Sequence, residues 1–288
     1  MNILSIQSWV AYGHVGNASA AFPLQRLGAE VWAVNTVQFS NHTGYGDWTG
    51  DVYSGAQIGR LIDGIAARDA LARCDAVLSG YMGDLGIGAA IIDAVARVKR
   101  ANPAALYCCD PVIGDDDTDV YVRAGIPGFM RDHAVAAADI LTPNLFELRH
   151  LTGLPCDTLA GVQRAIGVLQ AAGPGIVLVT SLRTPDTPDD AIDMIAGQAG
   201  QFWRLRTPLL PVRVNGAGDA IAALFLFHLL RGSSLAGEFD VAGALAEAGS
   251  AIHGLLRRTA AAGSRELLTV AAQDEFVSPT ERFAATLC

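Results

Sequence analysis

The sequence predicts an α/β fold in which a mostly parallel sheet carries helices on both faces. Short apolar runs alternate with helical ones along the 288 residues, and 51% of the residues are hydrophobic against 17% charged. Repeated strand–helix units form such sheets, and this much apolar material can bury a large core. No internal repeat, low-complexity tract or linker interrupts the pattern, so we expect residues 1–288 to form a single domain.

The first half of the chain alternates regularly between the two kinds of run. Apolar and β-branched stretches indicate strands, of which the second is rich in Val and Trp, and apolar residues at spacings of three and four indicate helices. The strands are expected at residues 3–7, 30–39, 76–79 and 105–109, and the helices at residues 18–27, 56–71 and 88–100.

The second half continues the pattern but adds a hairpin of antiparallel type. The run that follows Asp219 has Ile221, Leu224, Phe225 and Leu229 on one stripe of a 3.6-residue period, which predicts a helix. Strands are expected at 140–141 and 176–180, a hairpin from 191–195 with 201–205, and helices at 159–171, 219–230 and 241–256.

Composition argues against several classes of partner. The net charge is −9 and no basic run is present, so nucleic acid is not an expected partner. The longest apolar stretch, residues 220–230, is too short to span a bilayer, and the positive mean hydropathy comes largely from Ala and Gly. The first residues lack the features of a signal peptide, and the five cysteines include no C-x-x-C pair. We therefore expect a protein of the reducing cytoplasm, with no membrane contact.

Polar side chains follow most of the expected parallel strands. In an open α/β sheet, ligands bind at the carboxyl ends of the strands, so these residues are expected to meet in one crevice. They are Ser8 after the first strand, residues 41–43 after the second, Tyr81, Asp110, the pair Thr142 and Asn144, and the pair Thr180 and Ser181.

The segment NGAGD, residues 215–219, leads into the helix expected at 219–230. Successive amides with two glycines at a helix start can point at one anion, with help from the helix dipole. Asp219 would then stand beside the anion as a general base. The structural alternative is that Asp219 is the N-cap of the helix, a position that favours Asp.

Two other nucleotide motifs are absent. After the first strand the chain has only Gly13 and Gly16, which does not match the G-x-G-x-x-G dinucleotide fingerprint, and there is no Walker loop. Phosphoryl transfer also needs a hard cation, for which Asp110, Asp115 and Glu147 are the candidate ligands. Their structural alternatives are a turn cap for Asp110, a solvated loop charge for Asp115 and a first-turn helix acid for Glu147.

Six segments together resemble the pyridoxal kinases, the vitamin B6 branch of the ribokinase-like superfamily, and most closely the bacterial PdxY type. NTVQFSNHTGYG marks this branch, whereas NGAGD marks only the superfamily. The resemblance covers nearly the whole chain, in order. The segments are SxVxxGxVGN (8–17), NTVQFSNHTGYG (35–46), SGYMGD (79–84), DPVIGD (110–115), TPNLFEL (142–148) and NGAGD (215–219).

The resemblance implies a ribokinase-like three-layer α/β/α sandwich, usually a homodimer. The implied activity is Mg²⁺- and ATP-dependent phosphorylation of the 5′-hydroxymethyl group of pyridoxal in vitamin B6 salvage, and pyridoxine and pyridoxamine are further candidate substrates. A monovalent cation is an additional candidate cofactor.

The resemblance also implies roles for individual residues. Asp219 falls at the base and substrate-contacting position and Gly216, Ala217 and Gly218 at the anion hole. Substrate positions fall on Ser8, Thr43 and Gly44, with His42 and Tyr81 nearby. ATP positions fall on Asp110, Asp115, Tyr121, Thr142, Glu147, Thr180, Ser181, Val212, Arg213, Val214 and Asn215, of which Asp110 and Glu147 are also the metal positions.

The chain departs from the family pattern in three places. Many bacterial relatives carry a Lys where this chain has Thr180 and Ser181, the anion-hole motif has Ala217 where a hydroxyl or a Val is usual, and residues 115–119 are unusually acidic. Two alternative functions stay open. A hydroxymethylpyrimidine kinase commonly has a Cys at the base position, and a non-catalytic B6-binding protein would need a Lys for a Schiff base, whereas the only lysine is Lys99.

Overall fold

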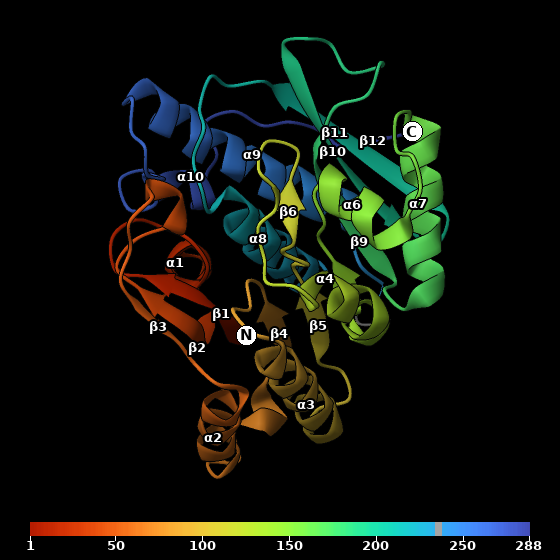
Figure 1. Ribbon diagram of the computed structural model, residues 1–288. Helices are drawn as coiled ribbons and strands as arrows, with labels where there is room; N and C mark the ends of the chain where they lie inside the picture. The colour runs from red at the N-terminus through yellow and green to blue at the C-terminus, as the bar shows by residue number, and fades with distance from the viewer. Residues whose placement is uncertain (234–237) are drawn as a thin grey trace.

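The computed structural model describes residues 1–233 and 238–288 as three layers, with a central sheet between two sets of helices (Figure 1). The described residues form a ten-stranded sheet of order β12-β11-β10-β9-β8-β5-β4-β1-β2-β3. The six strands from β9 through β2 in this order run parallel, and the strands at both edges pair antiparallel. The predicted α/β class and the mostly parallel sheet are confirmed.

The strands agree closely with the expected ranges. Those expected at 30–39, 76–79 and 140–141 have the same bounds in the structure, and both strands of the 191–208 hairpin are longer than expected. The strands of the sheet are β1 (Asn2–Val10), β2 (Glu30–Phe39), β3 (Gly50–Val52), β4 (Ala76–Ser79), β5 (Leu106–Cys109), β8 (Ile140–Leu141), β9 (Ile176–Leu182), β10 (Ala191–Gln198), β11 (Gln201–Pro208) and β12 (Thr286–Leu287). A separate hairpin consists of β6 (Gly114–Asp115) and β7 (Asp119–Val120).

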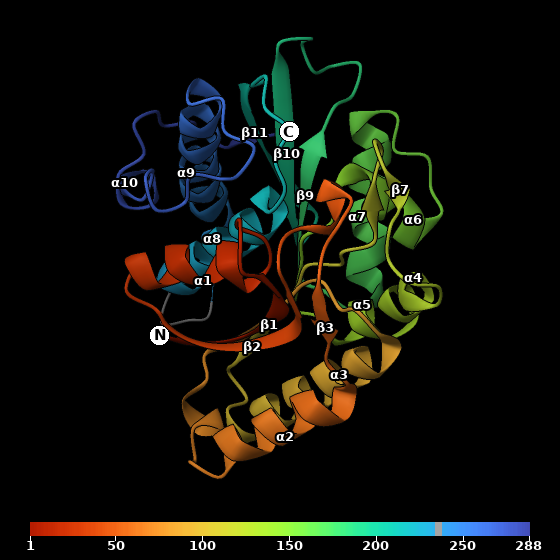
Figure 2. The ribbon, with the colours of Figure 1, turned by 60° about the vertical axis from the view of Figure 1, so that its left-hand side comes forward.

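One helical layer covers the face of the sheet to which Leu4, Val77 and Tyr107 point. Figure 2 shows α7 on this side of β9 and β10, and α8 and α9 on the other. The layer contains α2 (Gly55–Ala66), α3 (Leu85–Ala101), α4 (Ile126–Phe129), the π-helical turn η3 (Met130–Ala134), α5 (Val135–Ala137), α6 (Leu145–Thr152) and α7 (Leu159–Ala172).

The second layer covers the opposite face, to which Ile3, Leu78 and Cys108 point. The side chains of consecutive strand residues thus pack into two separate cores, because successive side chains of a strand point to opposite faces of the sheet. This layer contains α1 (Asn17–Arg26), α8 (Ala217–Arg231), α9 (Val241–Ala261) and α10 (Asp274–Val277). Two 3₁₀ turns, η1 (Thr43–Tyr45) and η2 (Leu71–Arg73), lie in connections.

The expected helix at 56–71 is too long. The helix α2 ends at Ala66, and Asp69, which follows it, has a left-handed φ of 54° that breaks the helix. The chain resumes in η2 only at Leu71. Within the described residues, none of the helices is long and apolar enough to cross a membrane.

Candidate active site

Most of the polar residues that follow the parallel strands line one cleft of about 480 Å³. The cleft lies at the carboxyl ends of the strands, where an open α/β sheet binds its ligands. Of the residues proposed from the sequence, its lining contains Ser8, His42, Thr43, Gly44, Tyr81, Asp110, Asp115, Tyr121, Thr142, Glu147, Thr180, Ser181, Val214, Asn215, Gly216, Ala217, Gly218 and Asp219.

Val212 and Arg213 do not line the cleft in this structure. The Arg213 side chain is 88% exposed, and its Nη1 lies 3.4 Å from Asp117 Oδ2 on the β6–β7 hairpin. This ion pair joins the segment before the NGAGD loop to the acidic hairpin. An exposed pair of this kind contributes little to stability because water screens it.

Sequence reasoning missed the apolar end of the cleft. Val10, Val15, Val37 and Phe39 line it and form a small core of their own, against which Tyr81 packs. Burial raises the pKa of the Tyr81 hydroxyl. Val112, Thr118 and Asn144 complete the lining. The cleft therefore has an apolar, aromatic end suited to a flat ring and a polar end formed by strands β5, β8 and β9.

The helix α8 begins without a capping side chain. Its N-cap is Gly216, at a left-handed φ of 90°. A Cβ at this residue would lie 1.9 Å from the carbonyl oxygen of His14, so only glycine fits the approach of the two loops. Ser19 Oγ donates to the Gly216 carbonyl at 2.8 Å and holds the loop from the other side. The start of α8 thus has no capping side chain, and its first residues line the cleft, which is the arrangement that binds anions at helix starts.

Asp219 is the third residue of α8, so the interpretation of Asp219 as the N-cap is wrong. Its carboxylate lines the cleft beside the α8 amides. Burial raises the pKa of Asp219 to about 6, and hydrogen bonds from the backbone of Gly16 and of Asp219 itself oppose the rise. A carboxylate with this pKa is ionised at neutral pH but is a stronger base than an exposed one.

Asp110 and Glu147 form the acidic part of the polar end. Thr142 Oγ1 donates to Asp110 Oδ1 at 3.0 Å, so Thr142 fixes the Asp110 carboxylate between the ends of β5 and β8. Burial raises the pKa of Asp110 well above its ordinary range, and the charges of Glu147 and Asp219 raise it further. Burial likewise raises the pKa of Glu147 to about 7.

Glu147 is both an acidic residue in the first turn of a helix and a lining residue of the cleft. It lies in the first turn of α6, and its carboxylate accepts from Asn144 N at 2.9 Å while the Asn144 side chain accepts from Glu147 N, which is a capping box. Its second oxygen accepts from Ile113 N at 2.9 Å. The capping box turns the carboxylate towards the cleft, so the two roles are compatible.

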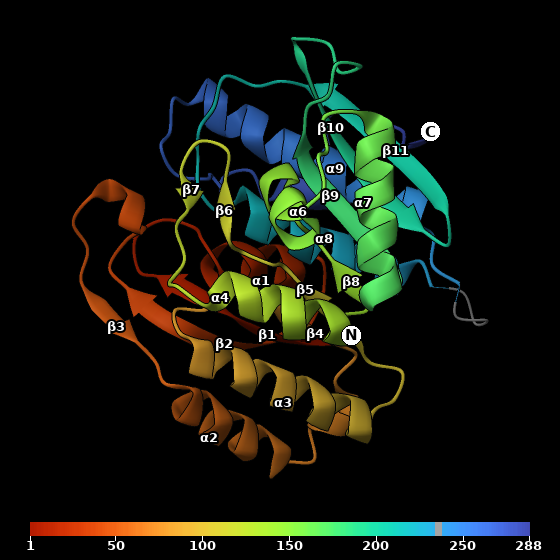
Figure 3. The ribbon, with the colours of Figure 1, turned by 45° about the vertical axis from the view of Figure 1, so that its right-hand side comes forward.

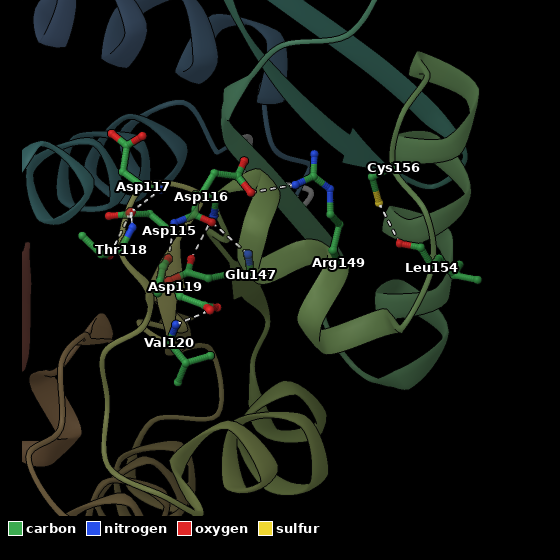
Figure 4. Close-up of polar contacts among 12 residues, drawn as sticks. Asp115, Asp116, Asp117, Thr118, Asp119, Val120, Glu147, Arg149, Leu154 and Cys156 are labelled. Atoms are coloured by element: carbon green, nitrogen blue, oxygen red, sulfur yellow. Dashed lines mark hydrogen bonds and ion pairs between the residues drawn. The ribbon is translucent and has the colours of Figure 1, made fainter.

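Asp115 holds the acidic hairpin in shape. Its Oδ1 accepts from Thr118 N at 2.8 Å and from Asp117 N at 2.9 Å, which closes the turn between β6 and β7. Figure 4 shows these contacts together with the ion pair between Asp116 and Arg149 of α6, at 2.8 Å. Figure 3 shows the hairpin standing beside α6. Asp115 is therefore more than a solvated charge, because its hydrogen bonds organise the wall of the cleft.

The fit of a magnesium ion follows from the charges of the lining. Four carboxylates, Asp110, Asp115, Glu147 and Asp219, line the cleft, and among the described lining residues there is no Lys or Arg. A hard cation with oxygen ligands would relieve the repulsion that raises the pKa of Asp110. In the described part of the chain no three acidic, His or Cys groups form a cage for a metal. Mg²⁺ commonly binds through one or two carboxylates, with water and phosphate oxygens completing its shell, so the donor set fits Mg²⁺.

The residues that the resemblance assigns to the substrate, namely Ser8, His42, Thr43, Gly44 and Tyr81, line the same cleft. Ser8 is buried near the end of β1, packed against Gly16, whose φ of 56° and lack of a Cβ allow the approach. His42 caps the η1 turn, and its Nδ1 accepts from Gly44 N at 3.1 Å. Burial lowers the pKa of His42, so its ring is neutral at pH 7. Thr43 and Gly44 follow it on the same turn.

Thr180 and Ser181 lie near the end of β9. The Thr180 amide donates to the carbonyl of Pro143 at 3.0 Å, which extends the parallel pairing to the loop that carries Asn144. Ser181 has a left-handed φ of 53°, an unusual conformation for a residue with a side chain. Residues held in such strained conformations occur preferentially at functional sites.

Lys99 lies away from the cleft. It belongs to α3, and its Nζ forms an ion pair with Asp139 Oδ2 at 2.6 Å. The chain contains no other lysine. No amino group of a side chain is therefore placed to form a Schiff base with an aldehyde bound in the cleft.

Comparisons with known proteins agree with this site. The family model for phosphomethylpyrimidine kinase matches residues 72–267. A pyridoxal kinase PdxY from Granulibacter bethesdensis is 62% identical over 100% of both chains. A pyridoxal kinase PdxY from Rubrobacter xylanophilus is 54% identical over 98% of this chain and 96% of its own.

Solved structures with the same architecture include the pyridoxal kinase from Leishmania donovani in complex with ADP and pyridoxamine. It is 28% identical, with a TM-score of 0.89 over 100% of this chain and 99% of its own. The complex of that kinase with ADP and pyridoxine superposes with a TM-score of 0.90. The full-length identity to the bacterial kinases and the ribokinase-like architecture lead to one conclusion: the chain belongs to the pyridoxal kinase family.

Proposed function

We propose that this protein transfers the γ-phosphoryl group of ATP to the 5′-hydroxymethyl group of pyridoxal, with pyridoxine and pyridoxamine as further substrates. One observation carries the proposal. The apolar end of the cleft, suited to a pyridine ring, joins a polar end of carboxylates and the uncapped start of α8, and Asp219 lies among the residues that line it. The membership of the pyridoxal kinase family supports the same reaction.

The vitamin ring would lie against the apolar end, between Val15 and Tyr81. Ser8 is proposed to contact the pyridine nitrogen, because a hydroxyl can donate or accept and so tolerates either protonation state of the ring. Thr43 is proposed to reach the 3-hydroxyl group, with His42 and Gly44 beside it. Because His42 is neutral, it can hydrogen-bond a polar ring substituent without attracting a second anion.

Asp219 is proposed to take the proton from the 5′-hydroxyl group as that oxygen attacks the γ-phosphorus. The pKa of about 6 keeps it ionised at neutral pH and close enough to the working pH for efficient transfer. The amides of Gly216, Ala217 and Gly218 would stabilise the charge of the transferred group, with the dipole of α8 adding to their effect. The protein thus supplies positioning and charge stabilisation, which phosphoryl transfer mainly requires.

Asp110 and Glu147 are proposed to hold Mg²⁺, directly or through water. When bound, the ion neutralises charge on the phosphate oxygens of the nucleotide. Thr142 keeps the Asp110 carboxylate in place through its 3.0 Å hydrogen bond. Thr180 and Ser181 are proposed to donate neutral hydrogen bonds to the nucleotide phosphates, and the segment from Val212 to Asn215 is proposed to approach the adenosine.

A hydroxymethylpyrimidine kinase is the second candidate, because the family model over residues 72–267 is named for the kinase of a related pyrimidine, phosphomethylpyrimidine. A ring with a hydroxymethyl group would also suit the apolar end. A non-catalytic B6-binding role is less well supported, since Lys99 is bound to Asp139 outside the cleft.

The test is ATP-dependent phosphate transfer to pyridoxal, pyridoxine, pyridoxamine and hydroxymethylpyrimidine, measured side by side by ADP release. We expect the highest kcat/KM on one of the three B6 vitamers. A higher kcat/KM on hydroxymethylpyrimidine would favour the second candidate. Tight vitamer binding without any ADP release would support a binding protein and refute the kinase proposal.

A further inference from the structure

The carboxylate of Glu266 joins two segments at the rim of the cleft but does not itself line it. Tyr45 Oη donates to Glu266 Oε1 at 2.6 Å, and the backbone amide of His14 donates to Glu266 Oε2 at 3.2 Å. The two oxygens of one side chain therefore tie the η1 turn to the turn between β1 and α1. We call this arrangement the rim clamp; it consists of Glu266, Tyr45 and the His14 amide.

Both tied segments carry residues of the site. The η1 turn presents His42, Thr43 and Gly44 to the vitamin end of the cleft, and Tyr45 is its last residue. The turn after β1 continues from His14 to Val15, which lines the cleft, and to Gly16, whose backbone hydrogen-bonds the Asp219 carboxylate. A shift of either segment would therefore move groups proposed to bind the vitamin.

The anchor side of the clamp is held firmly. Ser264 Oγ accepts from Glu266 N at 3.1 Å and donates to the Glu266 carbonyl at 2.7 Å. The next residue, Leu267, is fully buried in the core beneath α8 and α9. The Leu268 amide is bound by Thr259 Oγ1 of α9 at 3.2 Å. Glu266 is thus the fixed partner, and the two rim turns are positioned by it.

The surroundings are shaped to receive this carboxylate. Gly13 has a φ of 94°, and a Cβ there would lie 2.2 Å from Glu266 Oε2. Arg265 lies over the Tyr45 ring, 4.9 Å from its centroid, while Tyr12 meets the same ring edge-on at 6.2 Å. Glu266 is itself only half buried. Its contacts therefore serve the rim of the cleft more than the stability of the fold.

We propose that Glu266 is a positioning residue for the B6 vitamer, acting through Tyr45 and the His14 amide on the two turns that enclose the ring. The inference rests on the proposed function, because it assigns the apolar end of the cleft to the vitamin. The clamp is expected to affect the binding of the vitamin and not that of the nucleotide. It holds the vitamin end of the cleft, whereas the proposed nucleotide contacts come from β5, β8, β9 and the segment before α8.

Two substitutions test the clamp without removing its aromatic ring. Tyr45→Phe removes one hydrogen bond and leaves the ring under Arg265, and Glu266→Ala removes both bonds. We expect the pyridoxal KM of Tyr45→Phe to rise about three- to tenfold, the fold-change of one lost net hydrogen bond, with a larger rise in Glu266→Ala. The KM for ATP should stay within about twofold of the parent value, because the substitutions weaken the binding of the vitamin and leave the proposed nucleotide contacts in place. Combining the two substitutions should add nothing to Glu266→Ala, because both remove the same bond.

Glu247→Gln is the matched control. Glu247 is a half-exposed glutamate of α9 whose Oε1 lies 2.8 Å from Arg282 Nη1, and it lines a different cavity. This variant should keep the parent KM for both substrates. Calorimetric titration of pyridoxal without ATP gives the same comparison independently of turnover, and a melting curve of each variant reports its stability.

Three results would overturn the clamp. The first is a pyridoxal KM and Kd equal to the parent values in both Tyr45→Phe and Glu266→Ala. The second is an equal rise in the KM values of pyridoxal and ATP, together with a lower Tm. The third is a double variant in which the effects of the two substitutions multiply. A parent protein that binds pyridoxal but transfers no phosphate would instead refute the proposed function, and the binding titrations would still decide the clamp.

Discussion

Replacing Asp219 by asparagine should make the protein more stable and almost inactive at the same time. The Asp219 carboxylate lines the cleft in the first turn of α8, where burial raises its pKa to about 6. Asparagine has the same shape and keeps an acceptor oxygen for the Gly16 amide, but it carries no charge and cannot accept the substrate proton. The substitution therefore removes the catalytic base and, with it, the free-energy cost of burying an ionised carboxylate in the folded protein.

The size of the stability gain follows from the pKa. A rise from 3.8 to about 6 means that the ionised carboxylate costs the folded state up to about 3 kcal/mol at pH 8. Because the folded pKa is the higher one, the carboxyl group favours folding most below pH 3.8, and this contribution is lost as the pH rises through 6. Partial exposure to the cleft screens the charge, so we expect a gain of about 1–2 kcal/mol at pH 8 and roughly half of that at pH 5.

Melting curves of the nucleotide-free protein and steady-state kinetics with ATP test this reasoning. The Tm of Asp219→Asn should exceed that of the parent by about 2–6 °C at pH 8, with a smaller difference at pH 5. Its kcat should fall ~10²–10⁴-fold, while ATP still binds. In the parent, kcat/KM should decline on the acid side with an apparent pKa of about 6. A parent-like kcat in the folded variant would refute the role of Asp219 as the base, and a lower Tm at pH 8 would show that its charge stabilises the fold.

Three further predictions concern the two ends of the cleft. Asp110→Asn and Glu147→Gln should raise the Mg²⁺ concentration needed for half-maximal rate, since each removes a charge proposed to hold the ion; an unchanged metal dependence in both would assign them purely structural roles. Ser8→Ala should raise the KM for pyridoxal several-fold with little change for ATP, because one net hydrogen bond is worth about 0.5–1.5 kcal/mol. An unchanged pyridoxal KM with a clearly lower Tm would instead make Ser8 structural. Thr180→Lys should tighten ATP binding without a proportional gain in kcat, because a charge-assisted contact is stronger than a neutral one; weaker ATP binding would contradict the placement of Thr180 beside the phosphates.

The sheet was largely predictable because its parallel strands are short, apolar and separated by helices of ordinary length. The strand Ala76–Ser79 is an example, since both of its faces are buried and its run of apolar residues ends where the strand ends. The edge strands β3 and β12 were not predicted. Each of them is two or three residues long and exists only because β2 or β11 offers a free edge, which no local pattern indicates.

The polar half of the site was predictable and the apolar half was not. Asp110 and Thr142 directly follow strands, so topology alone brings them together. Ser8 and Val10 both line the cleft, and the pairing of β1 with β2 is irregular at this point, between Gln7 and Trp9. Such a bulge reverses the faces that simple alternation assigns. The N-cap interpretation of Asp219 failed for a related reason: the helix begins at Ala217, two residues earlier than expected, and its N-cap is the left-handed Gly216.

Glu266 had no sequence signal at all. Its partners Tyr45 and His14 lie more than 200 residues away along the chain, and each contact depends on how α9 returns past the first strand. Residues of this kind become visible only when the tertiary structure brings three separate segments together.

The most direct test of the account is a competition between the two substrate classes in one reaction. Equal concentrations of pyridoxal and hydroxymethylpyrimidine would share a limiting amount of ATP with Mg²⁺, and phosphorus NMR with mass spectrometry would identify the phosphate esters formed. We predict that the 5′-phosphate of pyridoxal accounts for nearly all transferred phosphate, and that Asp219→Asn forms neither product at a comparable rate. A predominance of the pyrimidine phosphate, or unimpaired transfer by Asp219→Asn, would contradict it.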